Sequence, residues 1–262
     1  MTLPVGLWLY RAMAETPKPP KRRARKSTRD TAAKKPGLRH RVLRAARRAL
    51  VWGGAGIAGF VLVWTLLYAL INPPTNAYML SEGRRLGGVQ QDWVPMGGIA
   101  PVMARSAVAA EDANFCLHWG LDVNAIRDAM ENGRGGASTI SQQVVKNLFL
   151  WHGRSWARKS VEAVWTPVIE VLWSKRRILE IYLNVAEFDT GVFGVQAAAR
   201  HYFGVDAGDL TATQAARLAA ILPAPKERSA SNPSGFTRNR AAQIMQGADT
   251  IAADGRAECF ER

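Results

Sequence analysis

Two adjacent carboxylates, Glu111 and Asp112, are the first residues placed to do acid–base chemistry, in the segment EDANFCLHWG. They end an apolar helix predicted over residues 101–110, and Phe115 and His118 follow them. A carboxylate at a helix carboxyl end feels the negative end of the macrodipole, and partial burial with a neighbouring carboxylate raises its pKa further. A raised pKa suits a general base or acid. From the residues alone, a solvated carboxylate pair is the commoner arrangement.

A second polar cluster, GGASTISQQVVKN over residues 135–147, begins with two glycines. Glycines allow the backbone to lie close to a ligand, and hydroxyl and amide side chains can bind sugar or phosphate oxygens. The segment lacks the Lys-Ser/Thr pair of a phosphate-binding P-loop. A loop that leads into a helix cap explains the residues equally well.

Three charged residues, Arg154, Arg158 and Glu162, are spaced four residues apart, with Lys159 beside them. In a helix this spacing lines two guanidiniums and one carboxylate along one face. Arginine presents paired donors to phosphate oxygens, so the row could hold a diphosphate. An exposed ladder of salt bridges is the alternative, and spacing alone favours it.

The elements that position these side chains are predicted to be helices, because few stretches alternate in hydrophobicity. We predict helices over residues 101–111, from a cap at Asp122 to Gly133, over residues 160–188, and from a capping box at Thr211 to Leu222. Pro167 should kink or divide the third. Residues 175–184, KRRILEIYLN, carry a core stripe typical of scaffold. The fold class is therefore mainly α, and any strands are minor.

One apolar run, over residues 49–71, contains 23 residues without charge. As a helix it would be roughly 34 Å long, enough to cross a hydrocarbon core about 30 Å thick. A buried core helix rarely runs so far without a polar face, and the apolar part of a signal peptide has only about 7–15 residues. We therefore predict an uncleaved transmembrane helix over residues 49–71.

Nearly all of the net charge of +14 lies before this apolar run, in residues 1–48. Residues 1–48 hold 15 Lys and Arg against 2 acidic residues, and the rest of the chain holds 20 against 19. A nearly neutral main domain argues against nucleic-acid binding. The positive-inside rule keeps residues 1–48 in the cytoplasm as a disordered basic tail, which is either attracted to anionic lipid or only a retention signal. Residues 72–262 form the exported domain.

The two cysteines, Cys116 and Cys259, exclude a disulfide-dense scaffold and show no metal-ligand spacing. They could pair in an oxidising compartment. Because Cys116 lies inside the first polar cluster, the sequence favours two unpaired thiols.

Taken in order, four segments resemble the signatures of the peptidoglycan glycosyltransferases of bacterial cell-wall synthesis. Those signatures read E-D-x-x-F-x-x-H-x-G, G-G-S-T-I-T-Q-Q-x-x-K-N, R-K-x-x-E and R-I-L-E-x-Y-L-N. The matching segments are residues 111–120, 136–147, 158–162 and 177–184. The sequences GASTISQQ and LFLWHGRSW are most similar to those of the monofunctional, membrane-anchored members found in Gram-negative bacteria. Among the departures, Val161 stands where some members carry a lysine.

The resemblance implies a lysozyme-like helical fold with a larger head lobe and a smaller, membrane-facing jaw lobe. It implies polymerisation of lipid II into β-1,4-linked glycan, with inversion and release of undecaprenyl diphosphate. By the same resemblance, Glu111 is the general base for the acceptor sugar's 4-hydroxyl. Glu162 would hold the diphosphate together with Lys146, Arg154, Arg158 and Lys159. The residues that would shape the site are Asp112, Phe115, His118, Thr139, Gln142 and Gln143.

The partners that the resemblance implies are lipid II, the growing glycan strand and the lipid bilayer, with elongation or division proteins as further candidates and no nucleic acid. The protein would lie in the bacterial inner membrane with its catalytic domain in the periplasm. No obligatory cofactor is expected. A divalent cation, Mg²⁺ or Mn²⁺, is compatible with the diphosphate, and its ligands are unknown.

Two other functions compete with this interpretation. A lysozyme-like glycan-cleaving enzyme, either a hydrolase or a lytic transglycosylase, also uses a catalytic glutamate. The basic row near Glu162 argues against it, because glycan cleavage releases no diphosphate. The other alternative is a non-catalytic membrane-tethered scaffold whose motifs are vestigial.

Overall fold

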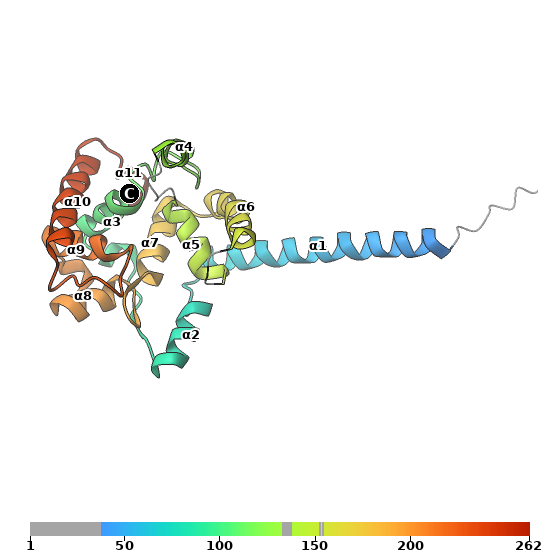
Figure 1. The fold of residues 1–262 in the computed structure, drawn as a ribbon, viewed down its shortest axis with the longest axis horizontal. Helices are drawn as coiled ribbons and strands as arrows, with labels where there is room; N and C mark the ends of the chain where they lie inside the picture. Colours follow the sequence, from blue (N-terminus) through green and yellow to red (C-terminus); the bar gives the residue numbers. More distant parts are fainter. Residues whose placement is uncertain (1–37, 133–137, 152, 154) are drawn as a thin grey trace, which may run out of the picture. The chain divides into compact units, whose positions relative to one another are not determined.

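The computed structural model describes residues 38–132, 138–151, 153 and 155–262. The chain divides into two units, residues 1–53 and residues 54–262. The described part is mainly helical, as predicted (Figure 1). The helices are α1 (Leu38–Leu70), α2 (Ala77–Leu86), α3 (Pro101–Glu111), α4 (Val123–Asn132), α5 (Ile140–Phe149), α6 (Trp156–Leu172), α7 (Lys175–Val185), α8 (Val195–Phe203), α9 (Ala212–Ile221), α10 (Gly235–Ala253) and α11 (Glu258–Glu261). Two 3-10 turns, Met96–Gly98 and Ala207–Asp209, complete the helical elements.

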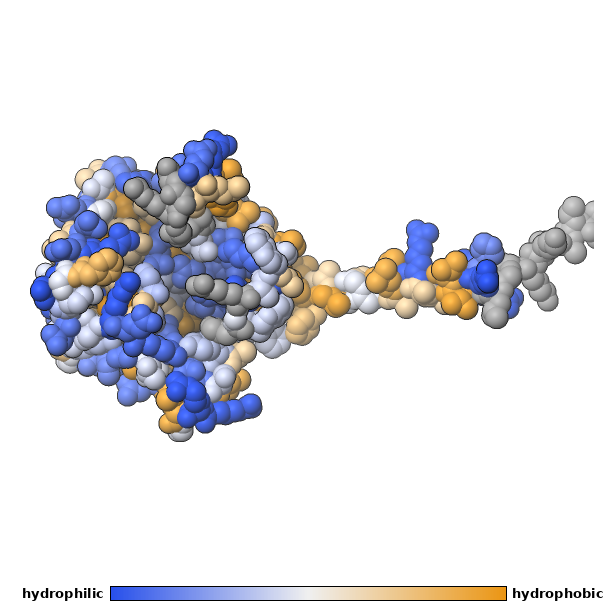
Figure 2. All heavy atoms as spheres, viewed as in Figure 1, coloured by the Kyte–Doolittle hydropathy of each residue, from blue (hydrophilic) through white to orange (hydrophobic). Residues whose placement is uncertain are grey.

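The first helix, α1, contains the predicted membrane segment. Residues 39–70 are long and apolar enough to cross a membrane, judged by length and composition. Most of their side chains are exposed, and Figure 2 shows hydrophobic residues along α1 after hydrophilic ones at its amino-terminal end. The helix begins at Leu38, before the uncharged run that starts at residue 49. The arginine-rich residues between these two points are therefore helical as well.

Helix ends follow the capping residues that the sequence shows. Pro101 occupies the first turn of α3, where its missing N–H costs no hydrogen bond. Asp122 accepts a hydrogen bond from the backbone N–H of Ala125 at 2.9 Å and caps α4. Thr211 opens α9 with a complete capping box. These predicted starts are confirmed, and Gly133, the predicted end of the second helix, lies outside the described residues.

Helices α3, α9 and α10 pack side by side (Figure 1). Their contacts are made mostly by alanine, which allows helix axes to approach closely; the buried residues include Ala216, Ala219, Ala220, Ala241 and Ile244. The packing of these three helices fixes the direction of α3 and so the position of its carboxyl end. The position of Glu111 is therefore set by the packing of α3 rather than by a loop.

A second group consists of α5, α6 and α7. The sequence predicted one nearly continuous helix over residues 160–188, kinked or divided at Pro167. The division is instead at Trp173, and Pro167 lies inside α6. The physical reason is the serine that follows, because the Ser174 hydroxyl accepts a 3.1 Å hydrogen bond from the backbone N–H of Arg177 and starts α7.

Strands are minor, as expected. β1 (Gln90–Gln91), β2 (Glu187–Asp189) and β3 (Val192–Phe193) form one sheet in the order β1-β3-β2. β1 pairs with β3 in parallel, and β2 pairs with β3 in antiparallel. The sheet lies against a core whose largest fully buried side chains include Tyr182, Phe115, Phe188, Phe193 and Phe260.

Candidate active site

Glu111 is the last residue of α3, and its partner comes from α5. The Gln143 side-chain amide donates a 2.7 Å hydrogen bond to the Glu111 carboxylate. Burial raises the pKa of the Glu111 carboxyl, while the Gln143 hydrogen bond and the positive charge of Lys146 oppose this rise without cancelling it. The result is a carboxylate with the elevated proton affinity that a general base requires.

Asp112 follows Glu111, but both of its carboxylate oxygens are held by contacts within the protein. One oxygen of its buried carboxylate lies 2.8 Å from the ring nitrogen Nε2 of His118. The other oxygen accepts a 3.0 Å hydrogen bond from the backbone N–H of Ile140, at the start of α5. Asp112 therefore joins the end of α3 to the start of α5 and orients His118.

Gly120 explains why the first cluster ends in glycine. Its φ of +81° is in the left-handed region, and a Cβ there would lie 2.5 Å from the side chain of Thr166 in α6. Its carbonyl accepts a 2.6 Å hydrogen bond from the Thr139 hydroxyl. The loop after Asp112 is thus clamped between α5 and α6.

Thr139 and Gln142 are brought to the site as a helix cap. The Thr139 hydroxyl accepts from the Gln142 backbone N–H, and the Gln142 side chain accepts from the Thr139 backbone N–H at 3.1 Å. Both residues are buried. Phe115 is also fully buried, in the core beneath the loop. Thr139 and Gln142 therefore position the start of α5, and Phe115 supports the loop.

The basic row forms around Glu162, which is only 2% exposed. Arg158 donates to one carboxylate oxygen at 2.7 Å, and Lys159 donates to the other at 2.5 Å. Lys159 also donates to the Ser138 hydroxyl at 3.1 Å. Burial of Glu162 and Arg158 is at odds with an exposed ladder of salt bridges. Arg154, the remaining member of the row, lies outside the described residues.

Lys146 connects the two carboxylates. It follows Gln143 by three residues on α5 and is partly buried. Burial lowers the pKa of its ammonium, and the charges of Glu162 and Glu111 oppose this effect. The ammonium therefore interacts electrostatically with both carboxylates, and the first three sequence clusters converge on one region.

The two residues of the Glu111–Gln143 hydrogen bond line two different cavities. One, of about 250 Å³, is lined by Glu111, Asp112, Ser138 and Thr139 among others. The other, of about 170 Å³, is lined by Gln143, Lys146, Asn147 and Tyr182 among others. The Glu111 carboxylate lines the first cavity and the Lys146 ammonium lines the second, so the first can accept a proton and the second can bind an anion.

Sequence reasoning overlooked a buried ion pair, Glu170 and Lys175. Lys175 donates to Glu170 at 2.9 Å and to the His118 carbonyl at 2.8 Å, and it lies 4.4 Å from the centre of the Phe115 ring. Glu170 also accepts a hydrogen bond from the Ser141 hydroxyl of α5. The available signal was the single carboxylate of Glu170 within the apolar run of α6, because a buried charge needs a partner.

Tyr182 is a second omission. It is fully buried, and its hydroxyl lies 3.5 Å from the Gln143 side-chain oxygen. Burial holds the pKa of this hydroxyl well above its ordinary value, so it remains a neutral hydrogen-bond donor. The sequence placed Tyr182 correctly in the core stripe, but nothing in it indicated that its hydroxyl points toward Gln143.

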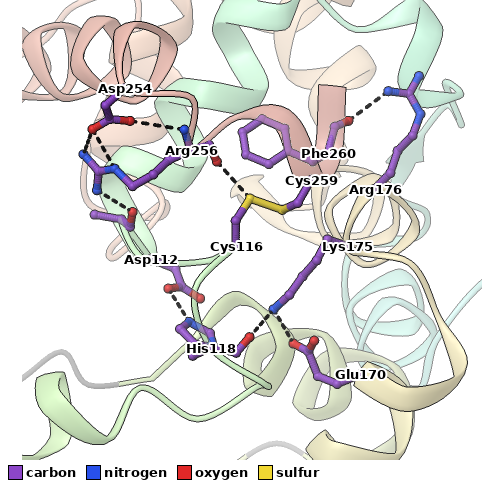
Figure 3. The surroundings of a disulfide bond; sticks show 11 residues. Asp112, Cys116, His118, Glu170, Lys175, Arg176, Asp254, Arg256, Cys259 and Phe260 are labelled. Carbon is purple, nitrogen blue, oxygen red and sulfur yellow. Dashed lines mark hydrogen bonds and ion pairs between the residues drawn. A yellow bond between two sulfur atoms is a disulfide. The ribbon is translucent and has the colours of Figure 1, made fainter. Parts of the chain in front are cut away.

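The expectation of two unpaired thiols is wrong, because Cys116 and Cys259 form a disulfide with a Cα–Cα distance of 5.8 Å. Figure 3 shows Cys116 pointing toward Cys259, while Asp112 and His118 point toward each other. The pair joins residues 143 positions apart. The position of Cys116 inside the first cluster was misleading, since its side chain points away from the Asp112–His118 contact.

Hydrogen bonds reinforce this attachment of the carboxyl-terminal segment. Arg256 donates to the Ala113 carbonyl at 2.9 Å, and Arg176 of α7 donates to the Phe260 carbonyl at 2.8 Å. The loop that carries Asp112 and His118 is thus anchored to the end of the chain (Figure 3).

Metal ligands do not gather in the described part of the chain. Across residues 38–132, 138–151, 153 and 155–262, no group of three or more His, Cys, Asp or Glu side chains is placed to hold an ion. Both oxygens of Glu162 are already paired with basic side chains. Among the described residues, the side chains of the site therefore do not gather into a cation site.

Comparison with known proteins agrees with the four sequence segments. A family model described as Transglycosylase matches residues 80–249. The chain is 57% identical over 241 residues to a biosynthetic peptidoglycan transglycosylase of Jannaschia sp. (strain CCS1), which covers 91% of this chain and 98% of that relative. Proteins of the same name from Pseudomonas entomophila and Yersinia pseudotuberculosis are 48% and 43% identical, over 219 and 223 residues. Each covers 78% of this chain, and the matches span 90% and 92% of those relatives.

Proposed function

The chain belongs to the transglycosylase family and is a peptidoglycan glycosyltransferase, and we propose that it polymerises lipid II with Glu111 as the general base. The observation that carries this assignment is the Glu111 carboxylate, which lines a cavity and whose pKa burial raises. Lys146 interacts electrostatically with this carboxylate and with Glu162, which pairs with Arg158 and Lys159.

In the proposed step, the Glu111 carboxylate takes the proton from the 4-hydroxyl of the acceptor sugar. The freed oxygen attacks the anomeric carbon of the donor sugar, and the bond from that carbon to the diphosphate oxygen breaks. The electron pair leaves with the diphosphate, and attack from the opposite face inverts the anomeric centre. Glu111 holds the proton, and the β-1,4 linkage is the new bond.

The leaving diphosphate gains negative charge as the bond breaks, so its stabilisation lowers the barrier. Lys146 and Lys159 supply ammonium groups and Arg158 supplies a guanidinium, while the buried Glu162 carboxylate holds Arg158 and Lys159 in place. Arg154 completes this set in the proposal. Asp112, His118 and Gln143 act as positioning residues through their hydrogen bonds.

The proposed location is the bacterial inner membrane, with the basic amino-terminal segment in the cytoplasm and residues 72–262 in the periplasm. Two observations support it, the apolar composition of α1 and the cluster of arginines that precedes its apolar part. A membrane anchor confines the enzyme to the surface that holds its lipid-linked substrate, which raises their effective concentration. Elongation or division proteins are proposed as further partners.

The test is polymerisation of purified lipid II by the full chain in lipid vesicles. We expect glycan strands from the wild type and none from Glu111→Gln, with thermal unfolding and membrane insertion unchanged. Glu131→Gln, at an exposed position on α4, is the matched control and should keep full activity.

The competing functions predict different products. A glycan-cleaving enzyme would shorten finished peptidoglycan and make no polymer from lipid II, and this result would reject the synthase. Full activity of Glu111→Gln would remove Glu111 as the base. Absence of both activities would leave the membrane-tethered scaffold as the explanation.

A further inference from the structure

The carboxyl end of α3, which carries Glu111, needs a cation from another element. The last four backbone carbonyls of an α-helix have no partner within the helix, and they carry the negative end of the helix dipole. A nearby cation stabilises such an end. The last turn of α3, which lies within the described residues, contains no basic residue of its own.

Helix α10 supplies this cation through Arg240. One nitrogen of its guanidinium donates a 3.1 Å hydrogen bond to the carbonyl of Ala110, the residue before Glu111. The donor and the acceptor are 130 positions apart in the sequence. Arg240 is partly buried, so solvent and salt screen its charge less than they screen an exposed charge.

The packing of α10 on α3 places Arg240 at this point. Ala110 packs against a cluster of buried residues that includes Ala241, the neighbour of Arg240. Two turns further along α10, a Cβ added to Gly247 would lie 3.1 Å from the Cβ of Ala109, so the two helices approach closely. The place of the guanidinium is therefore fixed by the same helix packing that fixes the end of α3.

Arg240 is next to the proposed base but outside its cavity. Asp122, Ser138 and Thr139 line the cavity at Glu111, and Arg240 is not among the described residues that do so. Burial raises the pKa of the Glu111 carboxyl, and the positive charge of Arg240 opposes this rise. Arg240 therefore acts through Glu111 instead of through contact with the substrate.

The other groups that influence Glu111 come from three directions. The Gln143 hydrogen bond and the Lys146 charge, both from α5, also oppose the effect of burial, whereas the charge of the adjacent Asp112 adds to it. From α7, the buried Tyr182 hydroxyl is neutral, because burial holds its pKa well above the ordinary value. Helix α9, which also packs against α3, carries one charged residue, Arg217.

We propose that Arg240 is a positioning residue for the proposed base, which holds the carboxyl end of α3 and stabilises the ionised form of Glu111. This role rests on the proposed function and deepens it, because it extends the catalytic unit to a helix that lines no part of the cavity at Glu111 among the described residues. A hydrogen bond to the preceding carbonyl and a charge near the carboxylate act in the same direction, since both offset negative charge at one helix end.

The first test is kcat against pH for lipid II polymerisation by the full chain in lipid vesicles. Arg240→Gln removes the charge and keeps an amide that can donate to the Ala110 carbonyl. Because the pKa of Glu111 then rises, the acid limb should move to higher pH by about 0.5–1 unit, less than the shift from a cation in direct contact. On the acid side the rate should fall about three- to tenfold. A merely structural role would lower kcat at every pH and leave the limb in place.

Matched variants separate the charge from the side chain. Arg240→Lys keeps the charge and should keep the wild-type limb, and Arg240→Met, a second neutral variant, should reproduce the shift. Arg238→Met is the control on the same helix, because Arg238 is exposed and donates to the Pro233 carbonyl. An unmoved limb in the neutral variants, or an equal shift in Arg240→Lys or Arg238→Met, would overturn the proposal. Unfolding of both neutral variants would mark Arg240 as a structural residue and overturn it as well.

Carbodiimide labelling provides a test that does not need turnover. A carbodiimide adds to a protonated carboxyl and not to a carboxylate, so peptide mass mapping over a series of pH values gives the titration midpoint of Glu111. This midpoint should be higher in Arg240→Gln than in the wild type, and Arg240→Lys should match the wild type. Equal midpoints in all three proteins would overturn the proposal. A shifted midpoint in a protein whose wild type makes no polymer at any pH would reject the proposed function alone, so the two failures are distinguishable.

Discussion

The side-chain amide of Gln143 donates a 2.7 Å hydrogen bond to the carboxylate of Glu111, and this contact joins the end of α3 to α5. It favours the ionised form of a carboxyl whose pKa burial raises. Gln143 therefore tunes the proposed base as well as orienting it.

Gln143→Leu should move the acid limb of the pH–rate profile to higher pH. Activity requires ionised Glu111, so the rate rises as pH passes upward through its raised pKa. Loss of the Gln143 donor raises the pKa of Glu111 further, and the limb follows. The measurement is kcat against pH for lipid II polymerisation. Gln246→Leu, at an exposed position on α10, is the control, and an unmoved acid limb in Gln143→Leu would contradict the assignment.

Lys146 should determine the alkaline limb. Burial lowers the pKa of Lys146 from its ordinary 10.5, so the ammonium loses its proton and the rate falls as pH rises through that lowered value. Lys146→Arg keeps the charge, and it should move the limb to higher pH in whatever activity it retains. The profile of kcat against pH for both proteins tests this, and coincident alkaline limbs would assign the limb to another group.

Removal of the Lys146 charge should lower the activity without lowering the stability of the fold. Lys146→Met should lower kcat about 10²–10³-fold, the usual effect of losing one group that stabilises developing negative charge. Because the folded-state pKa of Lys146 is lowered, its charged form costs stability below that pKa. Thermal unfolding at neutral pH should therefore show the Met variant equally or more stable, whereas a large fall in Tm would mark Lys146 as a structural residue.

The ion pair between Glu170 and Lys175 should behave as a buried unit. Lys175→Met leaves the Glu170 carboxylate without its cation and should cost about 3–5 kcal/mol of unfolding free energy. The double variant Glu170→Gln/Lys175→Met should recover most of this loss, since no buried charge remains. A double-mutant cycle on unfolding midpoints measures the coupling. Additive losses would show that the two side chains act independently.

The disulfide between Cys116 and Cys259 should stabilise the folded domain that it cross-links. The variant Cys116→Ser/Cys259→Ser should lose about 2–5 kcal/mol of unfolding free energy, because the cross-link restricts a long loop of the unfolded chain. Activity at low temperature should persist. The wild type with reductant should match the double variant, which itself should not respond to reductant, and equal stability of the oxidised wild type and the variant would refute the effect.

Local features were predictable because they depend on near neighbours in the chain. Pro101, Asp122 and Thr211 start helices as their types require. The contact of Arg158 with Glu162 follows from a spacing of four residues in a helix. The break at Trp173 was missed because the serine cap that follows overrides the proline as the point of division.

Sequence alone determined the family motifs, the apolar helix with its basic flank, and which residue types could act as base and as cations. Only the tertiary structure decided which residues come into contact. Gln143 hydrogen-bonds to Glu111, Asp112 hydrogen-bonds to the start of α5, and Cys116 forms a disulfide with Cys259. The physical reason is that pattern and propensity act within a few residues, whereas these contacts join segments that only helix packing brings together.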